Sequence, residues 1–116
     1  MRSFVMLALA LVLAVAGVAL QGAAAAGECG RVSADETAQR LAPCISAAND
    51  PNYKPTSSCC SVVHTIGQSP SCLCAAMLSR TARDAGIKPE VAITIPKRCN
   101  MADRPVGYKC GKYTMP

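Results

Sequence analysis

Between residues 33 and 48, apolar residues recur every three or four positions, which is the spacing of one helix face. Ser33 and Glu36 begin this stretch with the capping-box pattern S-x-x-E. The pattern predicts a helix from about Ser33 to Ala48. Pro43 lies inside it, so we expect a kink there, because proline lacks a backbone donor and collides with the preceding turn.

Three further helices are indicated by capping residues at their starts and by glycine or proline at their ends. Their expected spans are Thr56 or Ser57 to Ile66, Ser69-Pro70 to about Asp84, and Lys88-Pro89 to about Thr94. They end at Gly67, Gly86 and Pro96, in that order. No stretch of useful length alternates like a strand. The chain therefore predicts an all-α fold of four short helices, followed from Asn100 to Pro116 by an irregular C-terminal tail tied down by Cys110.

The most apolar part of the chain is its N-terminal stretch. Arg2 is followed by an uncharged run from Phe4 to Leu20 and then by four alanines that end at Ala26. This is the layout of a secretory signal peptide, so we expect residues 1–26 to be removed and residues 27–116 to form one secreted, extracellular domain. The alternative is an uncleaved membrane anchor, since the run is near the lower limit of a spanning length. The absence of a following basic cluster favours the signal peptide.

All eight cysteines lie in the expected mature part, which has no Trp, no Phe and few large aliphatic residues. These are few large apolar side chains for a packed core in a domain of this size. An even number of cysteines in a short secreted chain implies a framework of four disulfides. Closing a loop of about forty residues stabilises a fold by about 4 kcal/mol in the chain-entropy model. Disulfides therefore supply what the core lacks.

Charge and cysteine spacing exclude several classes of function. Without Arg2 the chain carries 11 basic and 7 acidic residues, and the basic ones are scattered. Nucleic acid is therefore a poor partner, whereas loose contact with anionic membranes or cell-wall polymers suits the charge, as does an ordinary solvated surface. The spacing lacks the C-x₂₋₄-C pairs of zinc sites and the C-x-x-C of redox sites, so we expect no metal and no cofactor.

The order of the cysteines is C…C…CC…CxC…C…C. Adjacent cysteines point about 100° apart on a helix, so Cys59 and Cys60 must bond to different elements. Together with the strings Leu41-Ala42-Pro43-Cys44 and Ile93-Thr94-Ile95-Pro96-Lys97-Arg98-Cys99, this order resembles the eight-cysteine motif of plant non-specific lipid transfer proteins. The wider group includes plant α-amylase/trypsin inhibitors and 2S seed albumins. The resemblance covers essentially the whole mature chain, and its short segment between CC and CxC is that of the smaller subtypes.

The resemblance implies four helices around an internal hydrophobic cavity. It implies binding of fatty acids, lysolipids or phospholipids and their transfer between membranes, by a monomer of the apoplast or cell wall that touches membrane surfaces transiently. Because the residue inside CxC, Leu73, is apolar, the resemblance implies the pairs Cys29–Cys72, Cys44–Cys59, Cys60–Cys99 and Cys74–Cys110. The alternative exchanges two partners and gives Cys29–Cys74 and Cys72–Cys110.

Binding of an acyl chain requires little more than an apolar wall. Each buried methylene contributes about 0.8 kcal/mol, so a chain of about sixteen carbons gains on the order of 10 kcal/mol before the costs of association. We expect the lipid-binding wall to consist of Leu41, Ile45, Val63, Leu73, Met77, Leu78, Ile87, Val91, Ile93 and Ile95. Candidate head-group contacts are Arg80, Arg83, Lys97, Arg98, Tyr108 and Tyr113. The alternative for the apolar set is an ordinary packed core, and the alternative for the head-group set is an ordinary exposed surface.

Catalysis finds little support in the sequence. The single histidine, His64, has no nucleophile motif or orienting acid near it in the sequence, and the cysteines are expected to be oxidised, so we expect no catalytic residue and no enzyme activity. The serious competitor is an inhibitor of α-amylase or trypsin-like enzymes with the same fold, acting through the loop at 49–58. The strings that end at Cys44 and Cys99 favour lipid binding instead.

Overall fold

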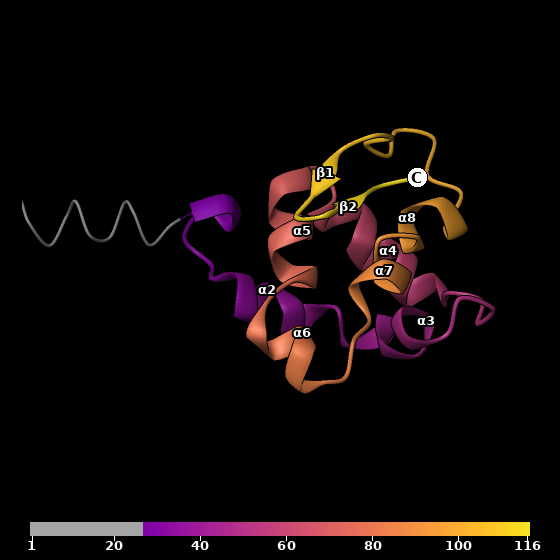
Figure 1. Cartoon of the computed structure of the whole chain (residues 1–116), viewed down its shortest axis with the longest axis horizontal. Coiled ribbons are helices and arrows are strands. Elements are labelled where there is room, and N and C mark those ends of the chain that lie inside the picture. Colours follow the sequence, from indigo (N-terminus) through magenta and orange to yellow (C-terminus); the bar gives the residue numbers. More distant parts are fainter. Residues whose placement is uncertain (1–26) are drawn as a thin grey trace, which may run out of the picture.

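The computed structural model describes residues 27–116, and the expected signal peptide, residues 1–26, lies outside the described residues. Helices dominate the described part (Figure 1). In chain order the helical elements are the 3₁₀ turn η1 (Gly27–Cys29), α2 (Ala34–Arg40), the 3₁₀ turn η2 (Ala42–Cys44), α3 (Ile45–Asn49), α4 (Ser57–Ile66), α5 (Pro70–Met77), α6 (Arg80–Asp84), α7 (Pro89–Ala92) and α8 (Ile95–Arg98). Two short strands, β1 (Lys109–Cys110) and β2 (Tyr113–Thr114), pair antiparallel near the C-terminus. The predicted all-α class is confirmed.

Side-chain caps begin three of the expected helices. The cap oxygens of Ser33, Thr56 and Ser69 accept the backbone N–H groups of Glu36, Cys59 and Cys72 at 3.1, 3.1 and 3.4 Å respectively. Each bond satisfies one of the donors that the first helical turn leaves without an intrahelical partner. None of the helices within residues 27–116 is both long enough and apolar enough to cross a bilayer.

Two of the expected helices are divided. The helix over residues 33–48 is broken after Arg40 into α2, η2 and α3, with Pro43 in the 3₁₀ turn, which confirms the predicted kink. The helix expected to run from Pro70 to Asp84 is instead two helices, α5 and α6. Ser79 causes this break, because its Oγ donates to Ala76 O at 2.7 Å and accepts from Ala82 N at 3.2 Å.

The expectation that Pro96 closes the fourth helix is wrong. α7 ends at Ala92, and Pro96 lies in the first turn of α8, where proline is tolerated because its missing N–H has no intrahelical partner to lose. The tail is also more regular than expected, because β1 and β2 pair around a turn at Gly111, which has a φ of 60° that favours glycine. Met101 and Met115 bury the tail against the core.

Four disulfides connect the elements, and none of the cysteines between residues 27 and 116 is free. The pairs are Cys29–Cys72, Cys44–Cys59, Cys60–Cys99 and Cys74–Cys110. These are the pairs that the resemblance implies. They join η1 to α5, η2 to α4, α4 to the end of α8, and α5 to β1. Figure 1 shows the tail beside α5, on the side of the molecule away from α3 and α6.

Candidate binding cavity

An apolar cavity of about 270 Å³ lies between the helices. One side consists of residues from α2, η2 and α3, and the other of residues from α5 through α8. Its least exposed lining residues are Val63 of α4, Ala76 of α5 and Ile95 of α8, which are at most 1% exposed. Among the lining residues, only Gln39 and Thr81 have polar side chains. The cavity therefore offers an environment for hydrocarbon and almost none for a buried charge.

Alanines create the space. Seven of the sixteen lining residues are alanine: Ala38, Ala42, Ala48, Ala76, Ala82, Ala85 and Ala92. A side chain that ends at Cβ lets a helix approach the cavity without filling it, whereas leucine or isoleucine would project into it. These residues are absent from the predicted wall, which contains only large aliphatic side chains. Alanines at helical spacing in residues 34–48 and 75–92 are the signal that could have found them.

Four of the lining residues are exposed to solvent: Gln39, Ala42, Ile45 and Ala85. Three of them lie on α2, η2 and α3, and Ala85 follows α6, so the mouth of the cavity opens between these two segments. Ile45 is 40% exposed and forms an apolar rim. A ligand that enters here would leave its polar end beside Gln39, in contact with water.

Six residues of the predicted lipid-binding wall line the cavity: Leu41, Ile45, Val63, Met77, Ile87 and Ile95. The other four do not line it. Leu73 and Ile93 are buried in the core, with Leu73 close to Met101 and Gly67. Leu78 packs toward the tail at Gly111, and Val91 is half-buried on α7. Leu73, Ile93 and Leu78 are apolar and at helical spacing, but they face the packed interior or the tail.

A hydrogen bond joins the two sides of the mouth. Asp35, on α2, accepts the backbone N–H of Thr81 through Oδ1 at 2.9 Å, at the start of α6. This bond, a second one from the Thr81 hydroxyl and the charges of Arg80 and Arg83 lower the pKa of Asp35 below its usual value of 3.8. The ionised carboxylate thus caps a helix other than its own.

None of the six candidate head-group residues lines the cavity. Arg80 and Arg83 are exposed on α6 near the mouth, and Arg80 Nε lies 3.9 Å from Asp84 Oδ2. Lys97 is exposed on α8. Tyr108 and Tyr113 pack against the core from the tail, at a distance from the mouth along the fold. Only the two arginines of α6 therefore lie where a head group at the mouth would be.

Arg98 has a different environment from the other candidates. Its Nη1 donates to Ala47 O at 2.7 Å and to Thr94 Oγ1 at 3.4 Å, and its Nη2 donates to Asp50 O at 2.9 Å and to Tyr53 O. The guanidinium thereby satisfies carbonyls at the end of α3 and in the loop that follows. Its donors are occupied by the protein itself, so we assign Arg98 to holding this loop and not to a ligand.

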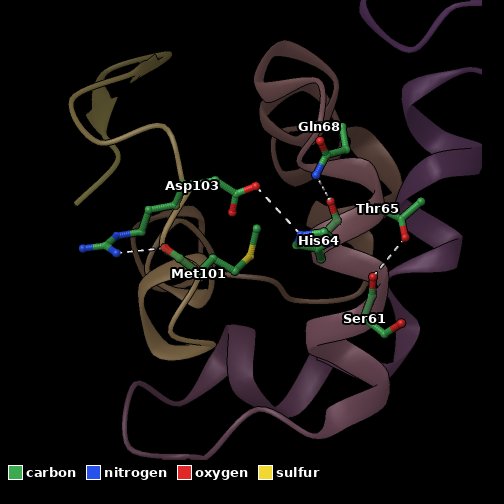
Figure 2. Close-up of polar contacts among 7 residues, drawn as sticks. Ser61, His64, Thr65, Gln68, Met101 and Asp103 are labelled. Atoms are coloured by element: carbon green, nitrogen blue, oxygen red, sulfur yellow. Dashed lines mark hydrogen bonds and ion pairs between the residues drawn. The ribbon is translucent and has the colours of Figure 1, made fainter.

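Figure 2 shows the surroundings of His64, which lies on the exposed face of α4. Its Nε2 is 3.8 Å from Asp103 Oδ2 in the tail, and both side chains are about 60% exposed, at 59% and 61%. Its neighbours Thr65 and Gln68 bond to backbone carbonyls of α4. His64 is therefore a solvent-exposed residue of α4.

A second hollow of about 420 Å³ lies between η1, α2, α4 and α5. Although it is larger, its lining includes the charged and amide side chains of Glu28, Arg40 and Gln68, and all three are exposed. It cannot remove an alkyl chain from water as completely as the first cavity, which is therefore the better candidate site.

Comparison with known families agrees with the cavity. A family profile described as "probable lipid transfer" matches residues 9–110, which is most of the chain. No match was found among curated proteins or among solved structures.

Proposed function

The chain belongs to the family described as "probable lipid transfer", and on that premise we propose that it is a secreted plant protein that binds fatty acids or phospholipids. It holds the acyl part in the cavity between α2, α5 and α6 and moves it between membranes or to the cell wall. It performs no reaction on its ligand.

The observation that carries this proposal is the apolar cavity with its single-sided mouth. Water in a cavity without polar partners makes few hydrogen bonds, so an apolar ligand replaces it favourably. The exposed rim at Ala42 and Ile45 allows entry without unfolding. The disulfide Cys44–Cys59 joins η2 to α4 across one wall, which opposes collapse of the helices into the space.

Direct binding tests the proposal. The oxidised secreted protein is titrated with a fluorescent fatty-acid analogue and the probe is then displaced with unlabelled fatty acid. We expect saturable binding at one site and full displacement, followed by accelerated movement of labelled lipid from donor to acceptor vesicles. Sequencing of the secreted N-terminus is expected to begin at Gly27, within about two residues, as a signal peptide requires.

The same preparation is assayed against α-amylase and trypsin, because the competing function is inhibition by an exposed loop. Residues 50–56 form such a loop, with Tyr53 at 46% exposure. Inhibition without saturable, displaceable probe binding would favour the inhibitor and contradict the lipid proposal. Probe binding without inhibition is the expected result.

A further inference from the structure

We propose that the cavity takes one acyl chain and buries about ten of its carbons, in space that alanines on α5, α6 and α7 leave open. This inference rests on the proposed function and names its ligand class: a single-chain amphiphile, such as a fatty acid or lysolipid, and not a phospholipid with both chains inside.

The volume sets the number of carbons. An apolar cavity of about 150 Å³ accommodates benzene, so a cavity of 270 Å³ has room for about ten or eleven carbons. A chain of sixteen carbons exceeds this space by about five carbons on the same scale. Such a chain therefore cannot be buried in full. Two chains of that length exceed it about three-fold.

We take the least exposed lining residues as the closed end of the cavity, which turns the volume into a length limit. Val63, Ala76 and Ile95 are at most 1% exposed. Val63 and Ala76 belong to α4 and α5, which carry two disulfide-bonded cysteines each. A chain that enters at the mouth therefore stops at this end with its methyl group. Carbons beyond the limit remain at the rim, where Ile45 covers them only in part and each gains little.

The polar end of such a ligand has one suitable place. Gln39 and Thr81, the two polar lining residues, lie on α2 and α6 at the two sides of the mouth. The exposed Arg83 is on the same helix as Thr81. A carboxylate at the mouth would thus keep its hydration and reach the Gln39 amide, while the buried end meets only hydrocarbon. The Thr81 hydroxyl already donates to Asp35, whose carboxylate also offsets part of the positive charge of Arg83.

The test is a chain-length series. Saturated carboxylates of about six to sixteen carbons, kept below micelle formation, compete with the fluorescent probe on the oxidised protein. We expect the dissociation constant to fall about four-fold per methylene up to about ten carbons and then to level off. In Ala82→Leu, whose side chain would enter the cavity from α6, we expect levelling about three carbons earlier. Ala102→Leu, at an exposed tail position outside the cavity, should leave the series unchanged.

The outcomes separate this inference from the function on which it rests. Absence of binding at every chain length contradicts the proposed function itself. Binding that strengthens without a break to about sixteen carbons, or a two-chain phospholipid bound as tightly as its lysolipid, overturns the length limit alone. The break in the unaltered protein decides the question even if Ala82→Leu fails to fold.

Discussion

The carboxylate of Asp35 connects the two sides of the cavity mouth. It lies in the first turn of α2, but its carboxylate accepts the N–H of Thr81 at the start of α6. A five-residue helix has little stability of its own, so it depends on caps and packing. Ser79 supplies one cap and Asp35 the second, from across the mouth.

The pH dependence of stability should report this contact. Because folding lowers the pKa of Asp35, its stabilising contribution is complete above the usual value of 3.8 and is lost as the pH falls through the lower folded value. We expect Asp35→Asn to remove that part of the acid dependence. Asp35→Ala, which also removes the acceptor, should lower Tm at neutral pH by about 2–4 °C. Glu36→Gln, which removes one charge from the same turn, should do neither; an equal effect would show that net charge alone is responsible.

Arg98 provides a second prediction at this scale, about the loop that follows α3. Lysine has the same charge but a single nitrogen, which cannot reach carbonyls on α3 and in the loop together. We expect Arg98→Lys to cost about 2 kcal/mol of unfolding free energy, measured from the denaturant midpoint with disulfides intact. Lys97→Ala, at the exposed neighbouring position, should change the midpoint little. Equal midpoints for Arg98→Lys and the unaltered protein would contradict the assigned role.

At the same scale, the sequence predicted part of the cavity wall and missed the rest for a physical reason. Helical spacing identifies which face of a helix is buried, and Val63 and Met77 lie on such faces. Spacing does not distinguish a buried face that packs from one that borders a void. Leu73 fits the helical spacing and packs in the core. Ala76 also lies on a buried face, but its small side chain adds little to the hydrophobic pattern, and it borders the cavity.

At the scale of elements, the starts of helices were predicted better than their interruptions. Thr56 and Ser69 stand before apolar runs, where a cap is expected. Ser79 lies inside a continuous helical pattern with no adjacent glycine or proline, and only the tertiary structure selects the local bonds of its hydroxyl over a continued helix. The break matters for function, because the short helix α6 that follows it contributes Thr81 and Ala82 to the cavity lining.

Replacement of Ser79 tests this division of the two helices. Ser79→Ala removes the cap of α6 and leaves the Ala82 N–H without its acceptor, so we expect a loss of about 1–2 kcal/mol in unfolding free energy. Because α6 carries part of the cavity wall, probe affinity should fall as well. Ser61→Ala on the exposed face of α4 is the matched control and should be near neutral in both measurements. Lost stability with unchanged affinity would show that α6 is not required at the cavity.

At the scale of the whole molecule, the cysteines are distributed unequally among the segments that line the cavity. Residues 75–98 contain no cysteine, yet they supply half of the lining residues, and all of the lining lies at or before Ile95. The tail therefore stabilises the fold without forming the cavity. The sequence indicated four bridges from the count of cysteines, but the specific pairs followed only from the family resemblance, since helix geometry required different partners for neighbouring cysteines such as Cys59 and Cys60 and left the pairs open.

Removing one bridge at a time should separate stability from binding. The Cys44–Cys59 bridge closes a separation of 15 residues and Cys74–Cys110 one of 36, so the chain-entropy model assigns them about 3 and about 4 kcal/mol. If stability alone mattered, removal of Cys74–Cys110 should lower the free energy of unfolding at least as much as removal of Cys44–Cys59. Cys44, however, lines the cavity and joins η2 to α4, whereas Cys110 lies in β1, outside the lining.

We therefore expect opposite rankings for the two double variants. The variant with Cys74→Ala and Cys110→Ala should have a Tm at or below that of the variant with Cys44→Ala and Cys59→Ala. At temperatures where it is folded, it should still show the dependence of affinity on chain length that the unaltered protein shows. Cys44→Ala with Cys59→Ala should weaken acyl binding more than its Tm predicts, because the helices on either side of η2 can then move into the space or apart. If affinity instead follows Tm in both variants, the cavity is held open by global stability and not by the bridge at its wall.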